Sequence, residues 1–124
     1  MARFRELMVY QKAYELVVSL YKFSKEMPED ERFGLTSQLK RAAFGIPVNI
    51  AEGYGKEDSR GELIRFLRMA KGSASELGVL IDICHDVGYM EDRYYEKYRE
   101  RTEEIARMLH GLIEKLSKLL QTAN

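Results

Sequence analysis

The residues with the clearest chemical potential are the carboxylate, thiol and imidazole at positions 82–85. Asp82 and His85 lie three positions apart, and Cys84 lies next to His85. Di-iron sites in helical bundles use a Glu-x-x-His pair twice, together with two further inward-facing glutamates. Here a single pair occurs, with Asp in place of Glu, and the apolar spacing puts Cys84 on the inner face instead. We therefore predict no metal site and expect Cys84 to be a small, buried apolar side chain.

A short run, Gly53-Tyr54-Gly55-Lys56, resembles part of a phosphate-binding loop. Such loops follow a strand and need a longer fixed spacing than this run has, so the run predicts a helix end. The residues at 82–85 do not form a nucleophile pair either, because the adjacent side chains of Cys84 and His85 point about 100° apart on a helix. A metal-dependent bundle enzyme stays as an alternative, which stoichiometric bound iron or manganese would reveal.

The central region also has a local excess of positive charge. Arg65 and Arg68 lie one helical turn apart, and Arg60 and Lys71 flank them. Cations gathered in this way bind the phosphates of RNA and make the binding salt-dependent, although they also occur on ordinary solvated faces that nearby carboxylates neutralise. The predicted contacts with nucleic acid or another partner are Arg41, Arg60, Arg65, Arg68 and Lys71.

The composition limits the classes of function. Among 124 residues, 20 Lys and Arg balance 20 Asp and Glu, and zero net charge argues against a histone-like coat on nucleic acid. A lone cysteine forms no disulfide framework, which is typical of the reducing cytosol. Neither a signal peptide nor an apolar run of the roughly 20 residues that span a bilayer is visible. We therefore expect one cytoplasmic domain, residues 1–124.

Apolar residues recur three and four positions apart in four segments, and no segment alternates as a strand does. The predicted helices cover residues 6–25, 33–55, 59–87 and 91–120. Short connections are typical of antiparallel neighbours in a bundle. We therefore predict an all-α fold, an antiparallel up-down-up-down four-helix bundle with a Pro-kinked second helix.

The second predicted helix is unusual because Pro47 lies in its middle. Proline lacks the N–H that the preceding turn needs, so we expect a kink there. Gly45 and Gly53 weaken the helix by roughly 1 kcal/mol each relative to alanine, so other helices must bury it at the centre of the bundle. Asn49 and Glu52 lie beside the kink. Either they satisfy backbone groups that Pro47 frees, or they and Pro47 shape the subunit core or an oligomer axis.

Three local signals refine the third helix. Ser59 and Glu62 fit a capping box, in which each side chain bonds the other residue's amide. The small residues 72–75 allow a neighbouring backbone to approach closely. Gly88 is a natural left-handed helix stop, with Tyr89 as its apolar contact.

More apolar residues occur than four inner stripes require. The extra positions are Val9, Leu16, Phe23, Phe44, Val48, Ile64, Ile83, Ile113 and Leu120. Scattered exposed apolar residues are normal, but so many on several helices indicate a second buried surface. We therefore predict a homo-oligomer.

Long motifs resemble the four-helix-bundle proteins that are encoded by intervening sequences in bacterial 23S rRNA genes. The residues that carry the resemblance are 7–13 (LMVYQKA), 33–43 (FGLTSQLKRAA), 46–53 (IPVNIAEG), 66–73 (FLRMAKGS) and Glu76-Leu77. The resemblance covers nearly the whole chain. It implies a small antiparallel bundle that assembles as a ring-like pentamer, with no enzyme activity and no cofactor.

A related group with the same fold is the accessory variability proteins of diversity-generating retroelements. Those resemble basic, pentameric partners of a reverse transcriptase and its RNA, whereas this chain has no net charge. We therefore predict a non-enzymatic, homo-oligomeric interaction module that associates with RNA or a nucleoprotein. The alternative is an accessory variability protein that binds a reverse transcriptase and its RNA.

Overall fold

The computed structural model describes residues 3–56 and 58–122, which form four long α-helices. These are α1 (Met8–Ser24), α2 (Leu35–Tyr54), α3 (Arg60–Asp86) and α4 (Asp92–Thr122). Two short 3-10 helices, Phe4–Glu6 and Glu29–Glu31, precede α1 and α2, and no strand occurs in the described ranges. The predicted all-α, four-helix fold is confirmed, and each predicted helix overlaps an observed one. None of the described helices is long and apolar enough to cross a membrane.

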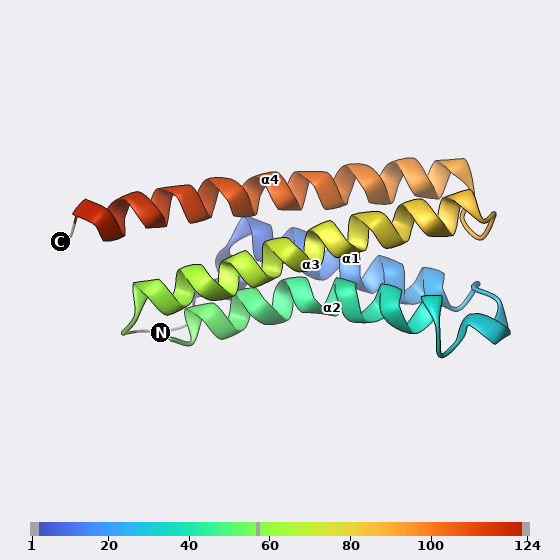
Figure 1. Cartoon of the computed structure of the whole chain (residues 1–124), viewed down its shortest axis with the longest axis horizontal. Helices are drawn as coiled ribbons and strands as arrows, with labels where there is room; N and C mark the ends of the chain where they lie inside the picture. Colours follow the sequence, from blue (N-terminus) through green and yellow to red (C-terminus); the bar gives the residue numbers. More distant parts are fainter. Residues whose placement is uncertain (1–2, 57, 123–124) are drawn as a thin grey trace.

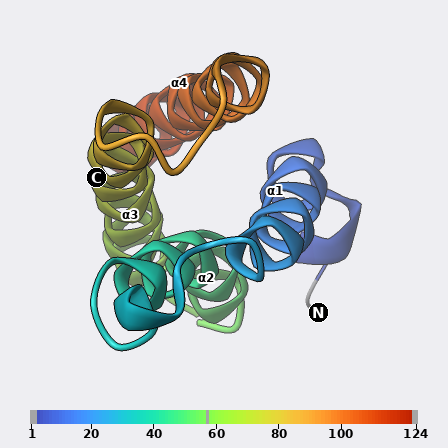
Figure 2. The same ribbon diagram turned by 90° about the vertical axis from the view of Figure 1, so that its right-hand side faces the viewer.

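The four helices pack around one core in a four-sided arrangement (Figure 2). α1 and α3 each contact both α2 and α4. Gly45 of α2 lies against Ser73 of α3, and Gly53 lies against Phe66, so residue numbers fall along α3 as they rise along α2. Figure 1 shows α1 and α3 running in one direction and α2 and α4 in the other, with the C-terminal end of α4 extending past its neighbours.

All four helices contribute to the core. Its largest fully buried side chains are Leu16, Leu20, Leu39, Ile46, Ile50, Leu67, Leu77, Ile81, Cys84, Ile105 and Leu109. Five of the residues assigned above to a second surface are buried here, so that assignment was wrong for Val9, Leu16, Phe23, Ile64 and Ile113. The physical reason is that a helix in a four-sided bundle buries a stripe wider than a two-position seam, because it packs against two neighbours.

The glycines of α2 are explained by its close approach to α3. A Cβ atom built on Gly53 would lie 3.0 Å from Cβ of Phe66 and 3.1 Å from Cδ1 of Leu63. One built on Gly45 would lie 2.5 Å from Oγ of Ser73, within the small-residue segment of α3. Pro47 lies inside α2, which is helical on both sides of it, and the kink at Pro47 stays a prediction.

The ends of α3 follow the local signals in the sequence. Ser59 caps the helix, its Oγ accepting a bond of 3.0 Å from the Glu62 amide. The other half of the predicted capping box, in which the Glu62 side chain accepts from the Ser59 amide, was wrong, because the Glu62 carboxylate binds Arg65 instead. At the other end Gly88 has a φ of 89°. The Tyr89 amide donates to the Cys84 carbonyl over 2.8 Å, which completes the predicted left-handed stop.

Candidate interaction surfaces

The structure separates the five predicted basic contacts into two groups. Arg60, Arg65, Arg68 and Lys71 lie on the first half of α3, whereas Arg41 lies on α2. Because Gly45 lies beside Ser73 and each helical residue advances 1.5 Å, Arg41 is displaced from Arg68 by roughly 14 Å along the bundle. Arg41 therefore does not belong to the same local cluster.

Two of the four α3 cations are engaged by neighbours. The Arg65 guanidinium donates two bonds to the Glu62 carboxylate, of 3.0 and 3.2 Å, and lies 4.6 Å from the centre of the Phe66 ring. The bond from Arg65 lowers the pKa of Glu62. Lys71 Nζ lies 2.9 Å from Nδ1 of His110 on α4. Arg65 is thus largely neutralised, and Lys71 is tied to α4.

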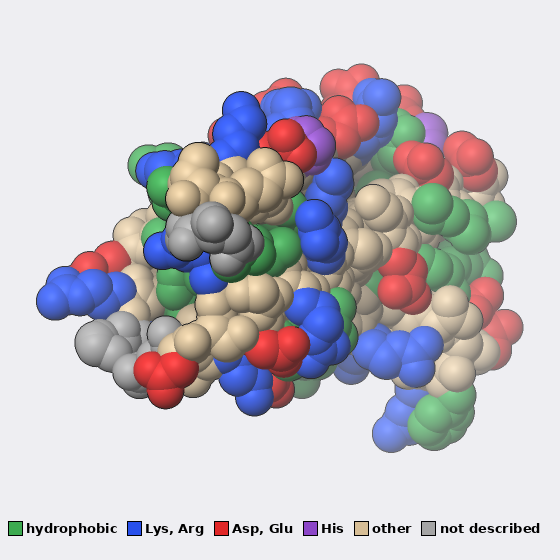
Figure 3. Space-filling model, turned by 60° about the vertical axis from the view of Figure 1, so that its left-hand side comes forward, with side chains coloured by type: hydrophobic (Ala, Val, Ile, Leu, Met, Phe, Trp, Pro, Cys, Tyr) green, Lys and Arg blue, Asp and Glu red, His purple; other side chains and the backbone are tan. Residues whose placement is uncertain are grey.

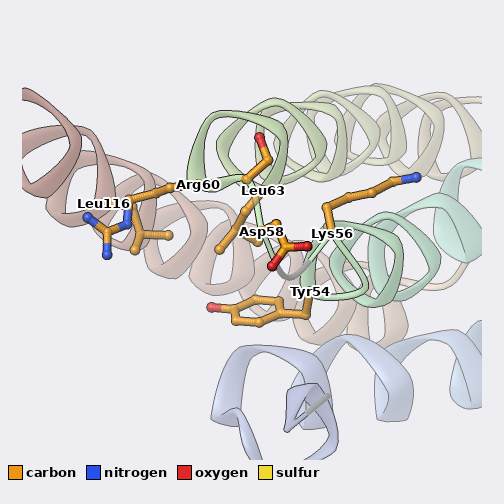
Figure 4. A pocket seen from close by; sticks show the side chains of 8 residues that line it. Tyr54, Lys56, Asp58, Arg60, Leu63 and Leu116 are labelled. Carbon is orange, nitrogen blue, oxygen red and sulfur yellow. The ribbon is translucent and has the colours of Figure 1, made fainter. Parts of the chain in front are cut away.

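The other two line hollows at the start of α3. Arg60 borders a hollow of about 620 Å³, which lies between the α2–α3 turn and Leu116 of α4. In Figure 4 the Arg60 guanidinium points to one side of this hollow and the Lys56 amine points to the other, with Tyr54 between them. Burial raises the pKa of Tyr54. The two cations do not converge, so this hollow does not form an anion pocket.

Arg68 borders a second, smaller hollow of about 260 Å³ between α3 and the end of α4. On the face of the molecule in Figure 3, Lys and Arg side chains alternate with Asp and Glu side chains and with neutral surface. Arg60 and Arg68 share their hollows with residues of α4, and Lys71 contacts His110 of α4, so these three residues lie on the α4 side of α3.

The polar residues around Pro47 have separate environments. Asn49 Nδ2 donates to the Gly45 carbonyl over 2.8 Å, so its side chain binds the carbonyl four residues earlier rather than that of Ala43, which Pro47 deprives of its partner. Pro47 is buried and Glu52 is exposed. The role of Pro47, Asn49 and Glu52 at an oligomer axis stays a prediction.

The group at positions 82–85 belongs to a cluster that joins α3 to α4. His85 Nε2 lies 2.7 Å from Oδ1 of Asp92, and its ring stacks on that of Tyr95 with centres 4.0 Å apart. The Tyr95 hydroxyl donates to Asp82 Oδ1 over 2.9 Å. Sequence analysis missed this cluster because Asp92 and Tyr95 follow the turn, beyond the helical spacing that was considered.

Cys84 is fully buried, as predicted. Burial raises the pKa of its thiol to about 11, with Glu31 adding to the effect, so the thiol stays protonated near neutral pH. Among residues 3–56 and 58–122, no group of three His, Cys, Asp or Glu side chains could hold a metal ion.

One exposed apolar surface lies where α1 and α2 meet, and we call it the α1–α2 face. It consists of Tyr14, Val18, Tyr21, Phe44 and Val48, all exposed. The rings of Tyr21 and Phe44 stack across the two helices, with centres 6.2 Å apart. Two lysines border it, since Lys40 Nζ and Lys25 Nζ lie 5.0 and 5.9 Å from the centre of the Tyr21 ring.

A second exposed apolar surface lies on α3, and we call it the α3 stripe. It consists of Val79, Ile83 and Val87, which are 58%, 41% and 55% exposed. These residues lie four positions apart, so they share one side of the helix. Sequence analysis identified Phe44, Val48 and Ile83 as surface apolar residues. The three- and four-residue apolar spacing of the first helix also predicts inner positions for Tyr14 and Tyr21, and this prediction is wrong, because both are exposed. The four-residue spacing of Tyr14 and Val18 could have indicated an outer stripe.

Two comparisons with known proteins found similarity to this chain. The family model described as 23S rRNA-intervening sequence protein matches residues 5–111. A crystal structure of a protein with unknown function, from the S23 ribosomal protein family of Bacteroides thetaiotaomicron, is similar with a TM-score of 0.79 and 25% sequence identity. The similarity covers 86% of this chain and 98% of the other. No curated protein matches the sequence.

Proposed function

Because this chain belongs to the 23S rRNA-intervening sequence protein family, we propose that it is a homo-oligomeric interaction module without catalytic activity. Its subunits associate through exposed apolar side chains into a ring, for which the family resemblance implies five copies. The observation that carries the proposal is the pair of surfaces defined above, the α1–α2 face and the α3 stripe.

These surfaces are not needed to complete the core of one subunit. The core residues of all four helices are already buried in a single chain, whereas Tyr14 and Val48 remain 55% and 54% exposed. Side chains of this size, contiguous on one face, mark a surface that another molecule covers. Covering them removes apolar area from water, which is the main driving force of subunit association.

The test is the mass of the wild-type protein in solution, measured by light scattering over a range of concentrations. We expect a mass near five times the 14.5 kDa of one chain. A mass of one chain at every concentration would contradict the proposal. A mass of another fixed number of copies would support self-assembly and would replace five as the number of subunits.

A second candidate function is RNA binding through the α4 side of α3. Arg60, Arg68 and Lys71 lie on this side and border or adjoin two hollows. A ring would repeat the cations in every subunit, and repeated phosphate contacts add to the affinity. In the accessory variability protein alternative, the RNA would be bound together with a reverse transcriptase.

The RNA proposal is tested by fluorescence anisotropy with labelled single-stranded RNA at several salt concentrations. Charge reversal at Arg60 and Arg68 should weaken binding and lower the slope of log affinity against log salt by about 1 to 2. The matched control is charge reversal at Arg107, an exposed residue of α4. Equal loss in the variant and the control, or no binding by wild-type protein, would contradict a specific RNA surface on α3.

A further inference from the structure

We propose that a hollow between the end of α1 and the start of α2 binds a small phosphate monoester, and we call it the turn hollow. It has a volume of about 210 Å³ and lies beside the turn that joins the two helices. Tyr21, Lys25, Arg32, Thr36 and Lys40 are among the residues that line it. One chain forms the whole site, so the proposal goes beyond self-assembly and RNA binding on α3 and depends on neither.

The first argument is the charge of the lining residues. Lys25, Arg32 and Lys40 line the hollow, and Glu29 is the one carboxylate that lines it with them. Three cations and one carboxylate give the lining a net charge of +2. A phosphate monoester is close to a dianion at neutral pH, so its charge balances that of the lining.

The other carboxylates of the turn have different positions. Glu26 and Asp30 are exposed and do not line the hollow. Glu31 accepts from the Tyr89 hydroxyl over 3.0 Å and from the Leu35 amide over 3.3 Å, so it is committed to contacts with the α3–α4 turn and with α2. The charged groups that a ligand in the hollow can touch are therefore mainly cations.

The second argument is the position of the two lysines. The amines of Lys40 and Lys25, from different helices, lie 5.0 and 5.9 Å from the centre of the same Tyr21 ring. Neither lysine forms an ion pair with another described residue. Like charges held around one ring repel each other, and an anion between them removes this repulsion. The hollow beside Arg60 differs, because its two cations point to opposite sides (Figure 4).

The third argument is the unpaired hydroxyl of Thr36. Thr36 lines the hollow and is 7% exposed, and its Oγ1 has no hydrogen-bond partner within the described residues. Buried polar groups without a partner are rare, and a bound ligand is one explanation for them. Threonine in a helix adopts two χ1 rotamers, so this hydroxyl can turn toward a phosphate oxygen in the hollow and donate to it.

The fourth argument is the start of α2. Gly34 precedes the helix and makes no side-chain capping bond, and the N–H groups of a first turn have no partner within their own helix. Glu31 takes the Leu35 amide, and Thr36 is the next residue of this turn. Helix starts attract phosphate because their N–H groups have partial positive charge. Here the helix start adds to the three cations and the unpaired hydroxyl.

The shape and chemistry of the hollow favour a phosphate monoester over a simple carboxylate. A phosphate group has three strong acceptor oxygens, which can meet Lys25, Arg32 and Lys40 from different directions. A carboxylate has two oxygens and half the charge. Met27 and Pro28 also line the hollow, and their apolar surface can contact the carbon atoms of an ester.

The test is an NMR titration of isotope-labelled protein with glycerol phosphate, at neutral pH and constant ionic strength. We expect saturable shifts of the amide signals of Thr36 and Lys40, and none with glycerol. Lys25→Gln and Lys40→Gln should each weaken binding about tenfold, because each removes one charge-assisted hydrogen bond. Lys22→Gln is the matched control, since Lys22 is an exposed lysine of α1 that does not line the hollow.

The hydroxyl is tested separately. Thr36→Val should weaken binding about fivefold, because valine cannot donate to the phosphate. Valine keeps the shape of the side chain, so circular dichroism should show an unchanged fold. Thr102→Val should bind as wild-type protein does, because Thr102 does not line the turn hollow.

A second titration with inorganic phosphate separates the two sources of the phosphate group. Tighter binding of glycerol phosphate supports the ester, whereas equal binding would overturn the ester and assign the site to free phosphate. Absence of saturable shifts with either compound, or equal loss in Lys22→Gln and Lys40→Gln, would overturn the site. A protein that binds glycerol phosphate as a single chain would overturn the proposed self-assembly and retain the site.

Discussion

Two buried threonines show how a single hydroxyl group can affect stability in opposite ways. Thr102 Oγ1 donates to the Tyr98 carbonyl over 2.7 Å. Thr36 is 7% exposed, and within the described part of the chain its Oγ1 is the one buried side-chain oxygen or nitrogen without a hydrogen-bond partner. A buried hydroxyl without a partner loses its bonds to water and gains nothing in return.

We therefore predict that Thr36→Val stabilises the protein by about 1 kcal/mol, because valine has nearly the same shape and no group that needs a partner. The measurement is the midpoint of urea unfolding, at an unchanged slope of free energy against urea. Thr102→Val is the matched control and should be neutral or destabilising, since it removes a satisfied bond. Equal gains in both variants would show that the hydroxyl of Thr36 is satisfied in solution.

At the scale of single elements, the distance between α2 and α3 is set by glycine. Gly53 has side-chain and backbone atoms of α3 within 3.3 Å of the position that a Cβ would occupy, whereas Gly111 of α4 has nothing within 4 Å. Alanine improves the helix by about 0.5 to 1 kcal/mol at either position. At Gly53 overpacking costs about 1 to 3 kcal/mol and outweighs that gain.

We predict that Gly53→Ala lowers the free energy of unfolding and that Gly111→Ala raises it, as measured by urea unfolding of both variants. Identical effects at the two positions would mean that α2 can move away from α3 at no cost.

The α3–α4 turn is held by His85 and should respond to pH. The bond to Asp92 is the main cause that raises the pKa of His85, and Asp86 adds to it. Because the pKa is higher in the folded chain, the stabilisation is fully present below the ordinary value of 6.5 and is lost as pH rises through the folded-state pKa.

Asp92→Asn should lower the pKa of His85, since the amide cannot stabilise the charged ring as a carboxylate does. An NMR titration of the imidazole measures this shift directly. The control is Glu100→Gln, an exposed carboxylate of the same helix, which should leave the titration unchanged. A His85 titration that Asp92→Asn does not alter would show that the two side chains are apart in solution.

At the scale of the whole molecule, assembly and folding should be linked. Association that favours the folded chain stabilises it by mass action, so the Tm of wild-type protein should rise with protein concentration. Phe44→Glu should remove most of this dependence, because it breaks the α1–α2 face without entering the core. Differential scanning calorimetry over a hundredfold range of concentration gives the answer. A concentration-independent Tm for wild-type protein would contradict a stabilising assembly.

Sequence by itself determined the helices, most of their ends and the fate of Cys84. The signals behind these features are local. Ser59 bonds an amide three residues away, Gly88 supplies a left-handed backbone angle, and apolar spacing marks the inner side of each helix. Close packing of α2 on α3 was also predictable, because small residues occur in both segments.

Only the tertiary structure decided which residues at the edges of the apolar stripes are covered. Ile64 is buried although its spacing predicts a position outside the inner stripe, and Tyr21 is exposed although its spacing predicts an inner position. The reason is that exposure depends on where two neighbouring helices lie. The same reason explains why Arg41 is separated from the other arginines and why His85 meets Asp92. These relations depend on the distances between different helices, and the spacing of residues along one helix gives no information about those distances.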